Sequence, residues 1–256
     1  MPLLEARNLT HRFEGLCAVS DFNFSLAPHE LVGIIGPNGA GKTTLFNLIT
    51  GVYRATEGTI KFSGEELVGQ TPHHINQLGI ARTFQNIRLF KELSVLDNVR
   101  IAYYGQTNYS PLEALLQIGR FRTEENRMFE SAMGMLKVFN LDDMADVAAK
   151  NLPYGLQRRL EIARAMATGP KLLLLDEPAA GMNPNEIETL MEFIHWIRDN
   201  FRLTIILIEH QMRLVMGICE RLVVLDFGAT IAEGLPAEIR SNAKVMEAYL
   251  GEEIVK

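Results

Sequence analysis

The sequence predicts an α/β fold whose core is interrupted by a helical insertion. Residues 1–64 are rich in strand patterns, residues 87–167 are dominated by Leu-, Met- and Glu-rich helical segments, and strands and helices alternate again from residue 168. An α/β core with an inserted group of helices is the simplest arrangement that accounts for this order. We therefore expect one domain over residues 1–256, with its core in 1–86 and 168–256 and a helical part at about 87–167.

The first elements follow from side-chain periodicity. "DFNFSLA" (21–27) places Phe22, Phe24 and Leu26 on one face, which is typical of a half-buried strand. The continuous apolar run "LVGII" (31–35) predicts a strand that is buried on both faces. A helix is expected next, at 42–50, and then a strand in "GTIKFSG". The inner side of the helix should carry Leu45, Leu48 and Ile49.

The second half of the chain alternates strands with helices. "KLLLLDE", "LTIILIEH" and "RLVVLDFG" predict strands, and residues 186–200 predict an amphipathic helix. The triplet Asp226-Phe227-Gly228 is interpreted as the turn of a hairpin, and residues 236–250 as helical. The apolar stripe of the amphipathic helix comprises Ile187, Leu190, Met191, Ile194 and Ile197.

Composition argues against several classes of protein. The net charge of −6 is unfavourable for binding duplex DNA, which usually requires a basic face. We expect no membrane span, because no run of about 20 apolar residues occurs, and no signal peptide, because the first residues alternate like a strand. Cys17 and Cys219 lack metal-ligand spacing and have apolar neighbours, so we expect two buried free thiols and a reducing compartment.

A glycine-rich loop between a predicted strand and a predicted helix indicates phosphate binding. Residues 36–43 match G-x-x-x-x-G-K-[ST] in full. Glycines allow backbone N–H groups to turn toward an anion, the helix presents its positive end, Lys42 adds a full charge and the Thr43 hydroxyl suits Mg²⁺. The residues expected around the phosphates are Gly36, Pro37, Asn38, Gly39, Ala40, Gly41, Lys42, Thr43 and Thr44.

Two carboxylates end the buried strand in "LLLLDEP". Asp176 is expected to support Mg²⁺, and Glu177 is expected to polarise the attacking water or accept its proton. Alone, such a pair could merely terminate a strand at the surface. Beside a complete phosphate loop, it predicts nucleotide hydrolysis.

Several motifs in one order resemble the ATP-binding cassette (ABC) family over essentially the whole chain. "TFQNIRLF" looks like the family's Q-loop, "LPYGLQRRLEIARAM" like its signature motif with the following helix, "AAGMNP" like its D-loop, and "LIEH" ends in the switch histidine. The resemblance implies an α/β P-loop NTPase core with an N-terminal antiparallel β subdomain and an inserted α-helical subdomain. It also implies ATP hydrolysis with ATP and Mg²⁺ as cofactors.

The resemblance assigns roles to individual residues. Gln85 would reach toward Mg²⁺ and water, His210 would contact the γ-phosphate, and Phe13 would stack on adenine, although Phe13 could also be a core residue. In this family two cassettes close head to tail, so that each nucleotide lies between one phosphate loop and the other subunit's signature motif. The implied catalytic residues are Glu177, His210, Gln85 and Lys42; the implied metal-binding residues are Thr43, Gln85 and Asp176; and Gly155 would face the partner's nucleotide.

Two positions depart from the family pattern. The usual signature L-S-G-G-Q is here Leu152-Pro-Tyr-Gly-Leu156, so Pro153 replaces the serine that would donate to the γ-phosphate. Losing that hydrogen bond in the transition state would slow hydrolysis roughly 10- to 150-fold. Asn183 stands where the family has an aspartate. These departures favour a heterodimer with unequal sites, while the alternative is that the remaining amides suffice and both sites turn over.

The longer motifs look most like ATPases of bacterial branched-chain amino acid importers, with urea or amide uptake and lipopolysaccharide export as close alternatives. The implied partners are transmembrane permease subunits, docked near Gln85–Phe90, a second ABC ATPase subunit and, indirectly, a periplasmic solute-binding protein. The implied location is the cytoplasmic face of the inner membrane. Two other classes of function are disfavoured. A soluble ABC protein that acts on ribosomes or nucleic acid would usually carry extensions that this sequence lacks, and a small-molecule kinase would need a lid that it also lacks.

Overall fold

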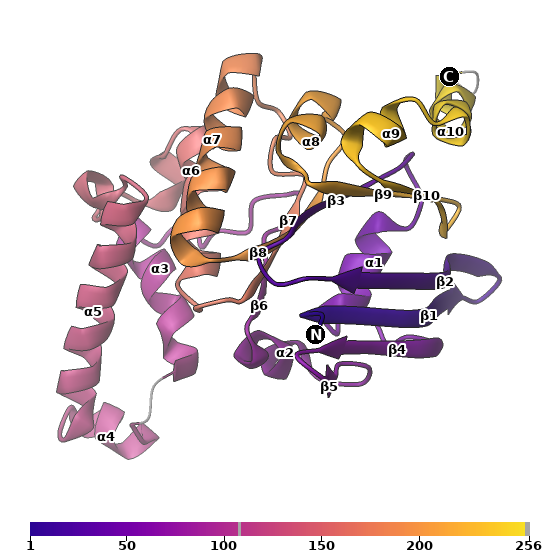
Figure 1. Ribbon diagram of the computed structural model, residues 1–256. Coiled ribbons are helices and arrows are strands. Elements are labelled where there is room, and N and C mark those ends of the chain that lie inside the picture. The colour runs from indigo at the N-terminus through magenta and orange to yellow at the C-terminus, as the bar shows by residue number, and fades with distance from the viewer. Residues whose placement is uncertain (107–108, 254–256) are drawn as a thin grey trace. The chain divides into compact units, whose positions relative to one another are not determined.

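The computed structural model describes residues 1–106 and 109–253. The chain forms two compact units (Figure 1). The first comprises Met1–Gln85 and Lys171–Lys256, and the second comprises Asn86–Pro170.

A six-stranded sheet forms the centre of the first unit, in the order β10-β9-β3-β8-β7-β6. All neighbouring pairs are parallel except β9 and β10, which form a hairpin. Every residue of β3, β7 and β8 is buried, which confirms that continuous apolar runs mark strands covered on both faces. The strands are β3 (Leu31–Ile35), β6 (Ile80–Arg82), β7 (Leu172–Asp176), β8 (Thr204–Ile208), β9 (Arg221–Asp226) and β10 (Ala229–Gly234).

A second, antiparallel sheet has the order β2-β1-β4-β5. Its strands are β1 (Leu4–Phe13), β2 (Leu16–Leu26), β4 (Glu57–Phe62) and β5 (Glu65–Glu66). Phe22, Phe24 and Leu26 are buried on one face of β2, as the alternation predicts. The fold class expected from the sequence is thereby confirmed for this unit.

Helix α1 (Lys42–Ile49) lies between the two sheets (Figure 1). Its buried side chains, including Leu45, Phe46 and Ile49, join one hydrophobic cluster with residues of both sheets. On the opposite face of the six-stranded sheet lie α7 (Pro184–Phe201) and α8 (Met212–Ile218). The remaining helices of the unit are α2 (Pro72–Leu78), α9 (Pro236–Arg240) and α10 (Ala243–Glu253).

The helical tail consists of two helices because the chain is interrupted at Ser241–Asn242. Asn242 Oδ1 accepts hydrogen bonds from the N–H groups of Lys244 (3.0 Å) and Val245 (3.4 Å), which starts α10 anew. The apolar stripe of α7 is buried at Ile187, Leu190, Ile194 and Ile197, whereas Met191 is only half-buried.

The second unit is helical. Helix α3 (Val95–Tyr103) packs against α5 (Arg120–Val138) and α6 (Tyr154–Met166). Buried Asn98 fixes the preceding loop, because its amide accepts from Phe90 N–H (2.9 Å) and donates to Phe90 C=O (3.0 Å). The other elements are α4 (Pro111–Leu116) and three 3₁₀ turns, η1 (Tyr104–Gln106), η2 (Asp142–Met144) and η3 (Ala149–Asn151).

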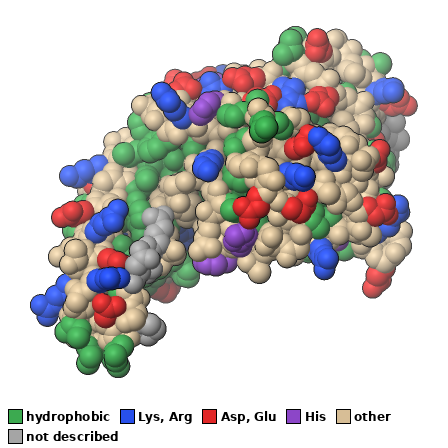
Figure 2. All heavy atoms as spheres, turned by 60° about the horizontal axis from the view of Figure 1, so that its bottom comes forward, with side chains coloured by type: hydrophobic (Ala, Val, Ile, Leu, Met, Phe, Trp, Pro, Cys, Tyr) green, Lys and Arg blue, Asp and Glu red, His purple; other side chains and the backbone are tan. Residues whose placement is uncertain are grey.

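Surface properties agree with the composition. Among the described residues, no helix is both long and apolar enough to cross a membrane. On the face that Figure 2 shows, Lys and Arg side chains are interspersed with Asp and Glu, and no continuous basic area is visible there.

Candidate functional site

Three parallel strands bring the candidate site together. Ile34 of β3 and Asp176 of β7 are each in register with Ile208 of β8, so the three strands end at the same level of the sheet. The glycine loop follows β3, Glu177 follows β7, and His210 comes two residues after β8. In open parallel sheets, ligands bind at the carboxyl ends of the strands.

The loop that follows β3 requires glycine for steric reasons at two positions. Gly36 has φ +149° and Gly41 has φ +100°. A Cβ atom at Gly36 would lie 2.0 Å from the carbonyl oxygen of Leu225, and one at Gly41 would lie 2.2 Å from that of Ala18. Neighbouring strands therefore approach the loop so closely that only glycine fits.

Lys42 begins α1 and is buried, with 6% of its surface exposed. Its Nζ donates to the carbonyl oxygens of Gly36 (2.7 Å) and Pro37 (2.8 Å), so the ammonium group lies across its own loop. Gly41 provides no side-chain cap for α1, and within the described chain the first turn carries no acidic residue. This helix end therefore keeps the positive character that suits an anion.

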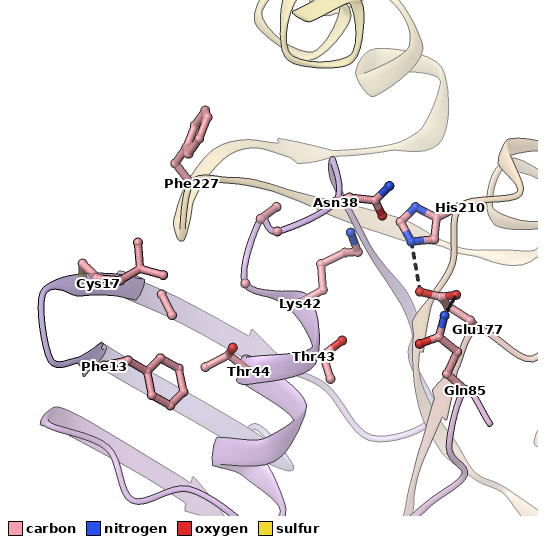
Figure 3. A pocket seen from close by; sticks show the side chains of 15 residues that line it. Phe13, Cys17, Asn38, Lys42, Thr43, Thr44, Gln85, Glu177, His210 and Phe227 are labelled. Atoms are coloured by element: carbon pink, nitrogen blue, oxygen red, sulfur yellow. Dashed lines mark hydrogen bonds and ion pairs between the residues drawn. The ribbon is translucent and has the colours of Figure 1, made fainter. Parts of the chain in front are cut away.

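A cavity of about 410 Å³ opens over this loop. Figure 3 shows Phe13 and Cys17 on one side of Lys42, and Glu177, His210 and Gln85 on the other. Its lining residues are Phe13, Leu16, Cys17, Ala18, Asn38, Gly39, Ala40, Gly41, Lys42, Thr43, Thr44, Gln85, Glu177, His210 and Phe227. Most residues expected from the sequence thus share one cavity, whereas Gly36, Pro37, Asp176 and Gly155 do not line it.

Glu177 contacts the two residues that are expected to act with it, Gln85 and His210. Its Oε2 accepts a hydrogen bond from Gln85 Nε2 (2.7 Å), and its Oε1 lies 3.0 Å from His210 Nε2, which donates when that nitrogen is protonated (Figure 3). The backbone of Glu177 is left-handed, with φ +46°, and its N–H donates to Ile208 C=O (2.8 Å). Such a conformation is costly for a non-glycine residue and occurs often at functional sites.

Asp176 ends β7, does not line the cavity and is 3% exposed. Its Oδ2 accepts a hydrogen bond from Arg82 Nη2 (2.7 Å). The residues expected to hold Mg²⁺ are Thr43 with a hydroxyl oxygen, Gln85 with an amide oxygen and Asp176 with a carboxylate oxygen. Mg²⁺ prefers oxygen donors of this kind. Among the described residues, no group of three or more His, Cys, Asp or Glu side chains could hold a metal. One carboxylate with a hydroxyl and an amide oxygen is a donor set that Mg²⁺ accepts.

Glu209 supports the loop that carries His210. It is 2% exposed, and its carboxylate accepts from the N–H groups of Ala179 (2.7 Å), His210 (2.9 Å) and Gln211 (3.2 Å). Burial raises the pKa of Glu209, and these backbone hydrogen bonds act in the opposite direction. Sequence inspection overlooked this residue, although an acid that follows a buried strand in "LIEH" was a visible signal.

Aromatic residues border the side of the cavity where Phe13 lies. Phe13 is 39% exposed, and its ring packs edge-to-face on His11 (4.5 Å) and Tyr53 (5.2 Å). Phe227 belongs to the β9–β10 turn, as expected for the Asp226-Phe227-Gly228 triplet, but its exposed side chain also lines the cavity. Cys17 is half-buried and lines the cavity, so the expectation of two buried thiols is correct only for Cys219.

The remaining motif residues begin helices. Pro153 is the N-terminal cap of α6 without a side-chain cap hydrogen bond, and Gly155 follows in its first turn, in the second unit. Asn183 caps α7, because its Oδ1 accepts from the N–H groups of Asn185 (3.0 Å) and Glu186 (3.1 Å). An aspartate could accept the same bonds, so the Asn183 departure preserves the cap.

Comparison with known proteins identifies relatives over nearly the full length. A family model described as "ABC transporter" matches residues 19–180, and one described as "Branched-chain amino acid ATP-binding cassette transporter" matches residues 229–255. The chain is 47% identical to the high-affinity branched-chain amino acid transport ATP-binding protein BraF of Pseudomonas aeruginosa, over 98% of both chains. It is 46% identical to the corresponding protein LivG of Escherichia coli, again over 98% of both.

A solved structure shows a similar fold. The crystal structure of the ADP conformation of MJ1267, an ATP-binding cassette of an ABC transporter, superimposes with a TM-score of 0.85. The two proteins are 32% identical, and the match covers 98% of this chain and 99% of the other.

Proposed function

The chain belongs to the ABC transporter family, and from that premise we propose that it is the ATP-hydrolysing subunit of an importer for branched-chain amino acids. The observation that carries the proposal is the near full-length similarity to two ATP-binding proteins of branched-chain amino acid transport. The separate family match at residues 229–255 supports the same class of cargo.

The cavity over the glycine loop is the proposed ATP site. The amides of the loop and of the first turn of α1 would receive the phosphates, and Lys42 would exchange its bonds to Gly36 and Pro37 for phosphate oxygens. Phe13 would carry the base, since stacking of a base on an aromatic ring is worth about 1–3 kcal/mol.

Glu177 is the proposed general base. Its two oxygens already accept from Gln85 and lie beside His210, and their remaining lone pairs could accept a hydrogen bond from the attacking water. Gln85 and His210 would then orient water and the γ-phosphate. Mg²⁺ supplies charge neutralisation between the phosphates when it is bound, and Thr43, Gln85 and Asp176 are the residues that would hold it.

We also assign a paired, membrane-associated assembly to this subunit. A second cassette would complete each ATP site with its signature motif, and permease subunits would hold the pair at the cytoplasmic face of the membrane. Pro153 removes both a hydroxyl and an N–H from this chain's signature, which favours a heterodimer in which the site completed by α6 is the slower one. Loss of the γ-phosphate would remove the contacts that favour the closed pair.

Transport in cells tests the cargo. A bacterial strain that lacks its own branched-chain cassette should regain uptake of radiolabelled leucine when it expresses this chain together with its cognate permeases. The Lys42→Ala variant should not restore uptake, while the exposed-site control Lys61→Ala should. Restored uptake of urea without uptake of leucine would contradict the assignment of cargo.

Single-turnover hydrolysis tests the asymmetry. Placing the Glu→Gln change in one subunit of the purified pair at a time should leave unequal rates, with the faster rate at the site that joins this chain's loop to the partner's signature. Equal rates from both sites would refute the unequal pair but would leave the ATPase assignment intact.

A further inference from the structure

We propose that Arg82 is a positioning residue for the part of the ATP site that would hold Mg²⁺. By bonding to both α1 and the end of β7, it would keep these two segments at a fixed distance and orientation. This inference rests on the proposed roles of Thr43 and Asp176 around Mg²⁺. Arg82 ends β6, the strand beside β7, and is in register with Leu174, two residues before Asp176.

The guanidinium of Arg82 makes two hydrogen bonds in different directions. Nη2 donates to Asp176 Oδ2 (2.7 Å), and Nη1 donates to Asn47 Oδ1 (2.6 Å). The arginine and aspartate side chains are only 6% and 4% exposed, so water screens this pair weakly. The planar guanidinium donates to two acceptors at once in fixed directions. A lysine ammonium group could also bond to two acceptors, but it does not fix their relative directions as tightly.

The second acceptor links Arg82 to the phosphate loop. Asn47 lies four residues after Thr43 in α1, so both side chains belong to one face of that helix. One guanidinium therefore connects the helix face that carries Thr43 with the strand end that carries Asp176. These are two of the three residues expected to hold the metal.

Two aromatic rings restrict the guanidinium further. Its central carbon lies 5.4 Å from the centroid of the Phe46 ring and 5.0 Å from that of Phe84. Phe46 is fully buried in α1, and Phe84 precedes Gln85 in the segment that reaches the cavity. Ring contacts from both segments limit how far the arginine can rotate.

The pairing also gives a hydrogen-bond donor to a carboxylate oxygen that is buried. Burying a carboxylate without a partner is strongly unfavourable, whereas an ion pair with further hydrogen bonds compensates part of that cost. Arg82 occupies Oδ2, and the orientation of Oδ1 is then set by the same contact. Residues that orient a metal's ligands usually change metal affinity about 10- to 100-fold when they are replaced.

The test measures metal binding directly, without hydrolysis. Free Mn²⁺ is followed by electron paramagnetic resonance while protein with a non-hydrolysable ATP analogue is titrated. Arg82→Met should weaken Mn²⁺ affinity about 10- to 100-fold, Asn47→Ala and Arg82→Lys should weaken it less, and affinity for the analogue in EDTA should change less than about threefold.

Arg221→Met is the matched control. Arg221 also forms ion pairs, with Glu30 and Glu233, and stacks on Phe24 at 5.2 Å, but it lies at the start of β9, four strands away from β6 in the sheet. The Arg221→Met variant should have lower thermal stability than the parent and the same Mn²⁺ affinity. If Arg82→Met does not fold, Arg82→Lys and Asn47→Ala decide the question.

Folded Arg82 and Asn47 variants that bind Mn²⁺ as the parent does would overturn the role of Arg82. An unchanged Mn²⁺ affinity in Asp176→Asn would instead overturn the proposed metal role of Asp176 on which this inference depends. The two failures are therefore distinguishable in one set of titrations.

Discussion

The ends of β3 and β7 lie in one sheet, yet they are built in different ways. The loop that follows β3 is rich in glycine, and Lys42 bonds to carbonyl groups of its own loop. The carboxylates at the end of β7 are held by side chains from other segments, namely Arg82, Gln85 and His210. The hydrogen bonds of Lys42 are local in sequence, whereas those of the two carboxylates depend on the order and register of the strands.

This difference predicts two kinds of damage. Changes at the end of β3 should affect whether nucleotide binds and whether the loop forms. Changes at the end of β7 should affect what happens to nucleotide after it has bound.

Glu177→Gln should lower the rate of ATP hydrolysis about 100- to 10,000-fold, because an amide cannot accept the proton of the attacking water. Phosphate release from the purified subunit pair measures this rate. Glu192→Gln on the exposed face of α7 is the control and should hydrolyse ATP at the parent's rate. Hydrolysis by Glu177→Gln at that same rate would remove Glu177 from the chemistry.

Gly41→Ala should destabilise the fold by about 3 kcal/mol or more, because its Cβ would collide with the backbone of Ala18 at a positive φ. Gly39→Ala is the matched control: φ is +79° there, but no described atom lies within 4 Å of the added Cβ. It should cost only about 1–2 kcal/mol. Urea denaturation compares the two, and equal losses would contradict the steric account of the loop.

Glu209→Gln should change the pH dependence of stability. Burial raises the pKa of Glu209, so its stabilising contribution is complete below the unfolded value of about 4.3 and is lost as the pH rises through the folded-state pKa. Glutamine does not titrate, so the variant does not lose stability by this route as the pH rises. The free energy of unfolding of the variant, relative to the parent, should therefore rise as the pH is increased toward neutrality.

Denaturation curves at a series of pH values measure this difference. A difference between variant and parent that stays constant with pH would show that Glu209 does not titrate differently in the folded and unfolded states.

Cys17 and Cys219 should react differently with a maleimide. Cys17 lines the cavity, whereas Cys219 is buried and burial raises the pKa of its thiol. Mass spectrometry should show faster labelling of Cys17, and an ATP analogue should slow that labelling several-fold while leaving Cys219 unaffected. Labelling of Cys17 that ignores the analogue would place the nucleotide away from this side of the cavity.

The sequence predicted the local features of this comparison well. The glycine loop, the buried strands and the α7 stripe follow from spacing and periodicity, so the α/β fold and the loop that lines the cavity could be predicted directly. Gln85 and His210 came only from family resemblance, because nothing in their immediate sequence shows that both reach Glu177.

Arg82 and Glu209 were missed for the same physical reason. Arg82 belongs to a strand of three residues, β6, which is too short to show periodicity, and its partner Asp176 is distant in sequence. Glu209 acts on the N–H groups of a loop that only the folded sheet places beside it. Contacts of this kind depend on strand order, which a single sequence does not reveal.

The affinity for ATP of Lys42→Ala and Glu177→Gln, measured side by side by equilibrium binding, tests most directly whether the two strand ends divide binding from chemistry. Lys42→Ala should bind about 10- to 150-fold more weakly than the parent, since a hydrogen bond to a charged group is worth about 1.5–3 kcal/mol, and Glu177→Gln should bind within about threefold of it. Lys42→Ala with the parent's affinity, or equal losses in both variants, would contradict that division.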